Sequence, residues 1–335
     1  MSEELTDTDR RKLRIGVMSF AHVHTPGFVA ILASMGCELV GADHDAERAA
    51  AAGQRYGIEI APDYDALLDR DLDGVVICAE NVYHRELTEK AAAAGAYALT
   101  EKPIATTLAD GRAMIEVCRK AEVGLMMAFP MRFAPPIAQV VATAQAGRLG
   151  QVVAIAGTNP GSCPGGWFAQ PELSGGGCVV DHTVHVADLM CAITGSTPKD
   201  VYAQINSIIT PEFGIETGGL VSIGFTDATI GTIDCSWSRL PTYPTWGGVT
   251  LEVIGTDGVM VVDAFGEHAA LYGDRATWLG YGADANRPMV AEFLASIREQ
   301  RMPVPDGTDG LNASAIAIAA YESAARAETV PALAN

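Results

Sequence analysis

The chain has 335 residues, of which 49% are hydrophobic, and its length exceeds the size at which one hydrophobic core usually stops growing, so two domains are expected. The formal net charge of −19 at pH 7 disfavours nucleic acid and anionic membranes as partners. No apolar run is long enough to cross a bilayer and the first residues lack the apolar stretch of a signal peptide, so we expect a soluble, cytoplasmic protein.

The first part of the chain alternates short apolar runs with helical patterns. Strands are predicted at residues 13–19, 38–42, 74–79, 97–100 and 124–128, and helices at 25–35, 46–56, 86–94 and 109–120. Apolar runs between helices are typical of parallel strands buried on both faces. The sequence therefore predicts an N-terminal Rossmann domain, a doubly wound parallel sheet, over residues 1–130.

After Phe129 the pattern changes to strands that alternate in polarity. Strands are predicted at residues 152–156, 201–209, 220–225, 229–237, 250–254 and 259–263, and helices at 135–146, 182–193, 289–299 and 310–325. Alternation favours a largely antiparallel sheet that is open on one face. We predict an α+β domain at 131–335 for substrate binding and oligomerisation, with a last helix that can pack back on the Rossmann domain. The open face predicts a homodimer or homotetramer.

The segment after the first predicted strand is a candidate dinucleotide-binding turn. Such a turn needs small residues, because the backbone approaches a pyrophosphate at a helix N-terminus. The three glycine positions of the usual motif hold Ser19, Ala21 and His24, so the motif is degraded, but it follows a strand and opens a helix. The predicted cofactor contacts of this turn are Gly16, Ser19, Phe20, Ala21 and His22.

Asp43 ends the second predicted strand, where a carboxylate accepts hydrogen bonds from the hydroxyls of the adenosine ribose. It would repel a 2′-phosphate, so NAD is favoured over NADP. The basic neighbour His44 weakens this preference, because it would tolerate a phosphate. The alternative for Asp43 is a solvated turn residue.

Three blocks resemble the family of glucose-fructose oxidoreductase, inositol dehydrogenase and MocA-like proteins (Gfo/Idh/MocA). They are Val-Val-Ile-Cys-Ala-Glu-Asn-Val-Tyr-His at 75–84, Leu-Thr-Glu-Lys-Pro at 99–103 and the glycine-led segment at 174–188. Ala79 and Glu80 replace the family's usual Thr-Pro. The resemblance implies an NAD cofactor, a cis peptide before Pro103, and further cofactor contacts at Ala79, Glu80, Asn81, His84, Glu101 and Lys102.

The third block places Asp181, His185 and Asp188 at i, i+4 and i+7, on one face of a predicted helix. Removal of a hydride from a carbinol carbon requires a base for the hydroxyl proton, and an imidazole suits that task. The resemblance implies that His185 is this acid/base. It also implies that Lys102 stabilises the developing alkoxide, while Asp181 binds the substrate or orients the imidazole.

Other residues are candidates for contact with a sugar-like substrate. An aromatic face packs against the C–H face of a sugar ring, although the same residues suit a domain core. The predicted substrate contacts are Arg132, Trp167, Phe168, His182 and Tyr281. His182 and His185 form an His-x-x-His pair, which is a spacing found in metal sites. Because no third ligand with recognisable spacing lies nearby, we predict no metal. Seven scattered cysteines are expected to be reduced thiols.

The sequence thus predicts an NAD-dependent dehydrogenase that transfers a hydride between nicotinamide and a hydroxyl-bearing carbon of a sugar, inositol or sugar derivative. Two alternatives remain open. One is an enzyme that retains NAD and oxidises a sugar transiently, to cleave or epimerise it. The other is an NAD-binding regulator without catalytic activity.

Overall fold

The computed structural model describes residues 11–240, 242–245, 247–280, 282 and 284–333. The chain divides into two compact units. The first comprises the described residues up to Ala105 together with Ala109–Ala128 and Asn286–Thr308. The second comprises Thr106–Leu108, Phe129–Ala285 and the described residues from Asp309 onward. The segment 286–308 therefore belongs to the first unit, although in sequence it lies far beyond the boundary near residue 130.

The first unit is built on a six-stranded parallel sheet in the order β3–β2–β1–β4–β5–β6. Its strands are β1 (Arg14–Met18), β2 (Glu38–Ala42), β3 (Glu59–Ile60), β4 (Gly74–Ile77), β5 (Tyr97–Thr100) and β6 (Leu125–Met127). The strand order reverses between β1 and β4. The loops after these two strands therefore meet at the carboxyl edge of the sheet, which is where this fold binds its ligands.

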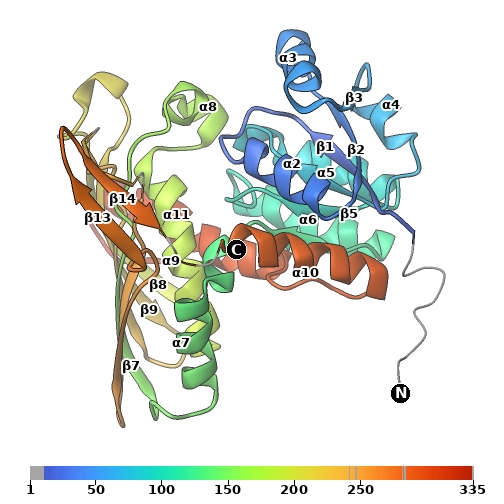
Figure 1. Cartoon of the computed structure of the whole chain (residues 1–335). Coiled ribbons are helices and arrows are strands. Elements are labelled where there is room, and N and C mark those ends of the chain that lie inside the picture. Colours follow the sequence, from blue (N-terminus) through green and yellow to red (C-terminus); the bar gives the residue numbers. More distant parts are fainter. Residues whose placement is uncertain (1–10, 241, 246, 281, 283, 334–335) are drawn as a thin grey trace. The chain divides into compact units, whose positions relative to one another are not determined.

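Helices accompany every strand of this sheet and complete its core. They are α2 (Thr25–Ser34), α3 (Ala46–Tyr56), α4 (Tyr64–Leu68), α5 (His84–Ala93), α6 (Leu108–Ala121) and the one-turn η1 (Asn81–Tyr83). A further helix, α10 (Asn286–Glu299), packs beside α2 (Figure 1). A Cβ on Gly74 of β4 would lie 3.0 Å from the buried ring of Phe293 and 2.8 Å from Ile297, so α10 packs directly on the sheet.

The second unit is built on a seven-stranded sheet in the order β12–β11–β7–β10–β9–β8–β15. Its strands are β7 (Val152–Thr158), β8 (Pro198–Asn206), β9 (Gly218–Phe225), β10 (Ile230–Asp234), β11 (Thr250–Gly255), β12 (Val259–Asp263) and β15 (Val330–Pro331). All neighbouring pairs are antiparallel except β7 and β10, which run parallel. A separate hairpin joins β13 (His268–Tyr272) and β14 (Ala276–Gly280).

The helices of the second unit connect and cover these strands. They are α7 (Pro135–Gln145), α8 (Pro171–Ser174), α9 (Cys178–Thr194) and α11 (Gly307–Arg326), with one-turn helices η2 (Pro130–Phe133), η3 (Gly166–Ala169) and η4 (Pro211–Phe213). Helix α9 lies against β7, β9 and β10 and covers one face of the sheet. Across the described part of the chain, no helix combines the length and apolar character that spanning a membrane requires.

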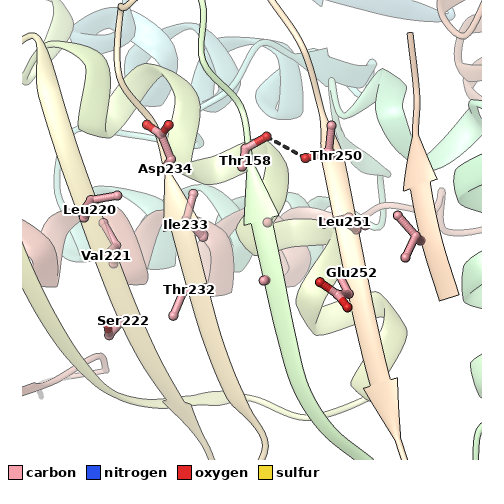
Figure 2. A pocket seen from close by; sticks show the side chains of 13 residues that line it. Thr158, Leu220, Val221, Ser222, Thr232, Ile233, Asp234, Thr250, Leu251 and Glu252 are labelled. Carbon is pink, nitrogen blue, oxygen red and sulfur yellow. Dashed lines mark hydrogen bonds between the residues drawn. The ribbon is translucent and has the colours of Figure 1, made fainter. Parts of the chain in front are cut away.

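The other face of this sheet carries exposed apolar side chains among the described residues. Leu220, Ile230 and Val261 point outward with 64%, 57% and 77% of their surface exposed, while their strand neighbours Val221 and Ile233 are buried. A hollow of about 490 Å³ lies on this face. A hydrogen bond of 2.7 Å joins the hydroxyls of Thr158 and Thr250 in its lining (Figure 2). None of the predicted catalytic residues lines the hollow. The sheet is thus open on one face, as the alternation predicts.

The predicted fold class is confirmed, and the differences are local. Helix α9 begins at Cys178 rather than near His182, so Asp181 lies in its first turn. Strand β8 ends at Asn206 rather than Ile209, because the Asn206 side chain accepts the N–H of Ile208 and starts a turn. The strands β3 and β15 were not predicted, since two residues carry no periodicity.

The position of α10 in the first unit predicts the effect of removing its central ring. Phe293→Ala leaves a cavity against β4 and should lower the free energy of unfolding by about 3–5 kcal/mol, measured by urea denaturation. The matched control is Phe213→Ala, at a ring that is 37% exposed, which should change stability by about 0.5 kcal/mol or less. Equal losses in the two variants would contradict this placement of α10.

Candidate active site

The turn after β1 keeps the shape of a glycine-rich turn without its glycines. Ser19 has a φ of 71°, in the left-handed region that glycine usually occupies. Its N–H donates to Ala42 O at the end of β2 (2.8 Å), and the N–H of His22 donates to Cys78 O after β4 (3.0 Å). Helix α2 begins directly afterwards at Thr25. These residues therefore fit a dinucleotide, because they bring a sharp turn to a helix N-terminus at the switch point of the sheet.

Gly16 has a different place from the rest of the predicted turn. It lies inside β1, where a Cβ would be 2.6 Å from the side chain of Leu72 and 3.1 Å from that of Val75. The absence of a side chain at Gly16 is therefore explained by packing within the first unit. Its predicted contact with the cofactor remains a prediction.

Asp43 and Glu80, both predicted at the cofactor, are joined by an arginine that the sequence reasoning missed. Arg48 donates from Nε and Nη2 to the two oxygens of Asp43 (2.7 and 2.8 Å) and from Nη1 to Glu80 Oε1 (3.2 Å). Asp43 also accepts the N–H of Phe20 (2.7 Å) and the hydroxyl of Ser19 (3.2 Å). Arg48 thus compensates two buried carboxylates. The sequence offered one signal for Arg48: its position in the first turn of the helix that follows β2.

Glu101 of the Glu-Lys-Pro block forms a buried cluster with two histidines of the turn. His24 Nδ1 lies 2.8 Å and His22 Nδ1 3.3 Å from Glu101 Oε1, while the N–H of Lys102 donates to Oε2 (3.3 Å). Burial raises the pKa of Glu101, but the two imidazoles and the Lys102 ammonium outweigh it and hold that pKa well below its usual range. The carboxylate is therefore ionised, and it links the turn after β1 to the segment that carries Lys102.

The same three side chains are a set that a metal ion could use, which the sequence reasoning did not find. One ligand atom from each of His22, His24 and Glu101 lies within 4.8 Å of the others. Hydrogen bonds already account for their geometry, since the backbone N–H of His24 donates to His22 Nδ1 (3.2 Å) and the His24 ring bonds Glu101. We therefore treat the cluster as a hydrogen-bonded network.

His84 holds the loop after β4 against the Lys102–Pro103 peptide, which is cis as the resemblance implies. His84 is fully buried and its Nδ1 lies 2.9 Å from Pro103 O. Burial lowers the pKa of His84, and its second ring nitrogen, Nε2, lies 3.3 Å from Ala79 O. Asn81 and Lys102 are also buried, with 4% of each exposed. The first unit therefore holds the predicted cofactor residues after β1, β2, β4 and β5 in several hydrogen-bonded clusters.

In the second unit, α9 is buried along nearly its whole length and takes its N-terminal cap from elsewhere in the chain. Glu216 Oε1 accepts the N–H groups of Gly177 (2.7 Å) and Val179 (3.2 Å). Tyr321 of α11 donates its hydroxyl to the same oxygen (2.6 Å) and accepts the N–H of Val180 (3.3 Å). Burial and the charge of Glu216 raise the pKa of Tyr321 well above its usual value. The sequence carries no local signal for this cap.

The predicted catalytic pair lies on this helix. Asp181 and His185 are one turn apart and are 6% and 5% exposed. Asp181 Oδ2 accepts the indole N–H of Trp237 (3.1 Å) and lies 3.2 Å from His182 Nε2. The ring of His185 packs edge-on against Phe129, with centroids 6.2 Å apart. The second unit thus holds Asp181 firmly, through a tryptophan that the sequence reasoning did not select.

The predicted substrate residues have varied surroundings. The Arg132 guanidinium forms a two-point ion pair with buried Asp188 (2.7 and 2.6 Å) and a further bond with Asp309 (2.8 Å). These contacts connect η2 to α9 and α11. The contact of Arg132 with substrate remains a prediction. Trp167 and Phe168 stack with centroids 3.9 Å apart, and Phe168 is buried. Tyr281 lies outside the described residues.

The cap on α9 predicts that Glu216 stabilises the second unit. Glu216→Ala leaves two buried N–H groups and the Tyr321 hydroxyl without their acceptor, so the free energy of unfolding should fall by about 1–3 kcal/mol. Chemical denaturation followed by circular dichroism measures this loss. Glu212→Ala, at an exposed carboxylate in η4, is the control and should be nearly neutral. A loss no greater than that of the control would show that the cap is dispensable.

The fold and these residues define an NAD-binding oxidoreductase with a Rossmann domain. Residues 15–129 match the family described as "Oxidoreductase family, NAD-binding Rossmann fold", and residues 137–261 match the "GFO/IDH/MocA C-terminal domain". The chain belongs to the Gfo/Idh/MocA family of oxidoreductases.

Curated relatives and solved structures agree over most of the chain. It is 27% identical over 84% of its length to a 1,5-anhydro-D-fructose reductase of Ensifer adhaerens, of which 86% is covered. It is 28% identical over 93% of its length to an inositol 2-dehydrogenase of Rhizobium meliloti (strain 1021), of which 97% is covered. Its fold matches that of GenD2 from gentamicin A biosynthesis, solved in complex with NAD, with a TM-score of 0.86, 22% identity and 97% of each chain covered.

Proposed function

We propose that the protein is an NAD-dependent dehydrogenase that oxidises a hydroxyl-bearing carbon of a sugar, inositol or sugar derivative. The observation that carries this proposal is the buried helix α9, which presents Asp181 and His185 one turn apart with Asp181 held by Trp237. The names of the relatives, a reductase of an anhydro-sugar and an inositol dehydrogenase, support the substrate class.

In the proposed reaction, each polar group has one task. His185 accepts the proton of the substrate hydroxyl as the carbinol carbon is oxidised and returns it in the reverse direction. Lys102 stabilises the negative charge that develops on the hydroxyl oxygen. Asp181 accepts a hydrogen bond from the substrate and so fixes its orientation.

The cofactor set of the first unit supports NAD as the partner of this reaction. Ser19, Phe20, Ala21 and His22 would face the pyrophosphate from the turn after β1, and Asp43 would bind the adenosine ribose. The segment from Ala79 to His84 and the Glu101–Lys102 pair would lie along the nicotinamide side. Bound NAD supplies the hydride acceptor. Arg48 bonds both Asp43 and Glu80, so each carboxylate has a cationic partner beside the cofactor.

The test is a screen of sugars, inositols and anhydro-sugars, with NADH formation followed by absorbance and NADP run in parallel. Lys102→Ala and His185→Ala should each lower kcat on the best substrate by about 10²–10⁴-fold without loss of fold. Lys120→Ala, at a lysine that is 67% exposed in α6, should keep wild-type rates. Wild-type rates in either active-site variant would refute the assignment. Co-purified NAD with glycoside cleavage but no net NADH would favour transient oxidation.

We further propose that the open face of the second sheet joins two copies of the chain. This face exposes Leu220, Ile230 and Val261 beside small polar residues, a composition typical of a subunit contact. Light scattering after size exclusion should give a mass of twice or four times 35.1 kDa. Ile230→Lys should shift the mass toward the monomer. A 35.1 kDa species as the only wild-type form would exclude the assembly.

A further inference from the structure

Arg239 lies in the segment that follows β10, two residues beyond the tryptophan whose indole bonds Asp181. Its backbone N–H donates to Gly161 O (2.8 Å), and its backbone oxygen accepts the hydroxyl of Ser162 (3.1 Å). Both partners belong to the segment that follows β7. Because β7 and β10 run parallel, the segments after these two strands leave the same edge of the sheet.

The segment after β7 also contacts helix α9 beside Asp181. The backbone oxygen of Asn159 lies 2.8 Å from His182 Nδ1, and the Asn159 side chain donates to the backbone oxygen of His182 (3.2 Å). Burial raises the pKa of the Cys163 thiol, and the charge of Asp181 adds to that rise. The segment that anchors Arg239 therefore lies next to the turn of α9 that carries Asp181.

The guanidinium of Arg239 is held by an aromatic ring and a glycine. Its Cζ lies 3.6 Å from the centroid of the Tyr243 ring, and a Cβ on Gly248 would lie 2.8 Å from Nη2. A Cβ on the adjacent Gly247 would lie 3.9 Å from the side-chain oxygen of Asn159, so the guanidinium is near the residue that bonds His182. The side chain is thus fixed at the same edge of the sheet as its backbone.

The N–H donors of this guanidinium are not used by carboxylates. The side chain is partly buried and Nε is fully buried, yet within the described parts of the chain nothing accepts a hydrogen bond from Nε. Arg48 and Arg132, in contrast, each bond two carboxylates. A guanidinium carries five N–H donors in a planar fork that matches an oxyanion. Arg239 is therefore suited to bind an anionic group of a ligand.

We propose that Arg239 is a specificity residue that binds a carboxylate group of the substrate, an inference that rests on the proposed dehydrogenase function. The substrate class is then a sugar acid, whose hydroxyl faces Asp181 and His185 while its carboxylate bonds Arg239. One guanidinium balances the single charge of a carboxylate, whereas a phosphate monoester carries about 1.5–2 charges at pH 7. A carboxylate is therefore favoured over a phosphate group.

The first experiment measures binding and needs no turnover. Isothermal titration calorimetry on the full-length protein saturated with NADH, which cannot accept a hydride, compares D-glucuronate and D-galacturonate with D-glucose and D-galactose. At least one acid should bind about 10–100-fold tighter than its neutral counterpart, because it adds hydrogen bonds to a charged group. Equal affinities of acid and neutral sugar, or tighter binding of D-glucose 6-phosphate than of either acid, would overturn the proposal.

Variants of the guanidinium and its ring test the same preference. Arg239→Gln should bring the Kd of the acid to that of the neutral sugar, and Arg239→Lys should restore part of the preference, because it keeps the charge and loses the fork. Tyr243→Leu removes the stacking ring and should weaken the preference by a smaller factor. Arg275→Gln, at an exposed arginine, makes the same change of charge and should have no effect. A preference that persists in folded Arg239→Gln, checked by circular dichroism, would also contradict the proposal.

The second experiment separates this subsite from the proposed dehydrogenase function. With the best acid as substrate, Arg239→Gln should raise KM by about 10–100-fold and leave kcat within about twofold, since the guanidinium contacts a group that does not react. Loss of NADH formation in every protein, with the acid preference kept in calorimetry, would refute the dehydrogenase and leave the subsite in place. Oxidation of neutral sugars only, at rates unchanged in Arg239→Gln, would refute the subsite and leave the dehydrogenase in place.

Discussion

The second unit depends on how the N-terminal turn of α9 is satisfied. The helix is buried on nearly all sides, so its first backbone N–H groups have no water to bind. Glu216, from the segment before β9, and Tyr321, from α11, supply the missing acceptors. Because both come from distant parts of the chain, the turn that carries Asp181 forms only when the whole unit is folded. The helix then offers a rigid support for polar groups that must keep their orientation.

Both units contain buried carboxylates that are paired with basic side chains. Asp43 is bonded by Arg48, Glu101 by two histidines, and Asp188 by Arg132. Complete burial raises the pKa of Asp188, and the charge of Arg132 opposes that rise. Since an isolated buried charge is strongly destabilising, these pairs constrain the loops that carry them. The ion pairs therefore fix the local geometry of these loops within each unit.

In the turn after β1, side-chain hydrogen bonds hold the backbone shape that glycines provide in the usual motif. In this chain Ser19 takes the left-handed backbone that glycine favours, and its hydroxyl bonds Asp43. His24, which replaces the third glycine of the motif, and its neighbour His22 contact the Glu-Lys-Pro block through Glu101. The turn is thus held by bonds between its own side chains and neighbouring loops. A pattern search on glycines alone misses it.

The sequence by itself determined the two-sheet architecture, because strand and helix periodicity reports local burial on one or both faces. It also singled out Lys102, Asp181 and His185 as candidate catalytic residues, through the Glu-Lys-Pro block and the helical spacing of the third block. Only the tertiary structure decided which groups hold these residues in place. Trp237 and Glu216 lie far from Asp181 in sequence, and no periodicity links them, since their contacts arise when separate strands and helices pack together. For the same reason, the structure alone assigned α10 to the first unit, where its apolar side chains cover β4.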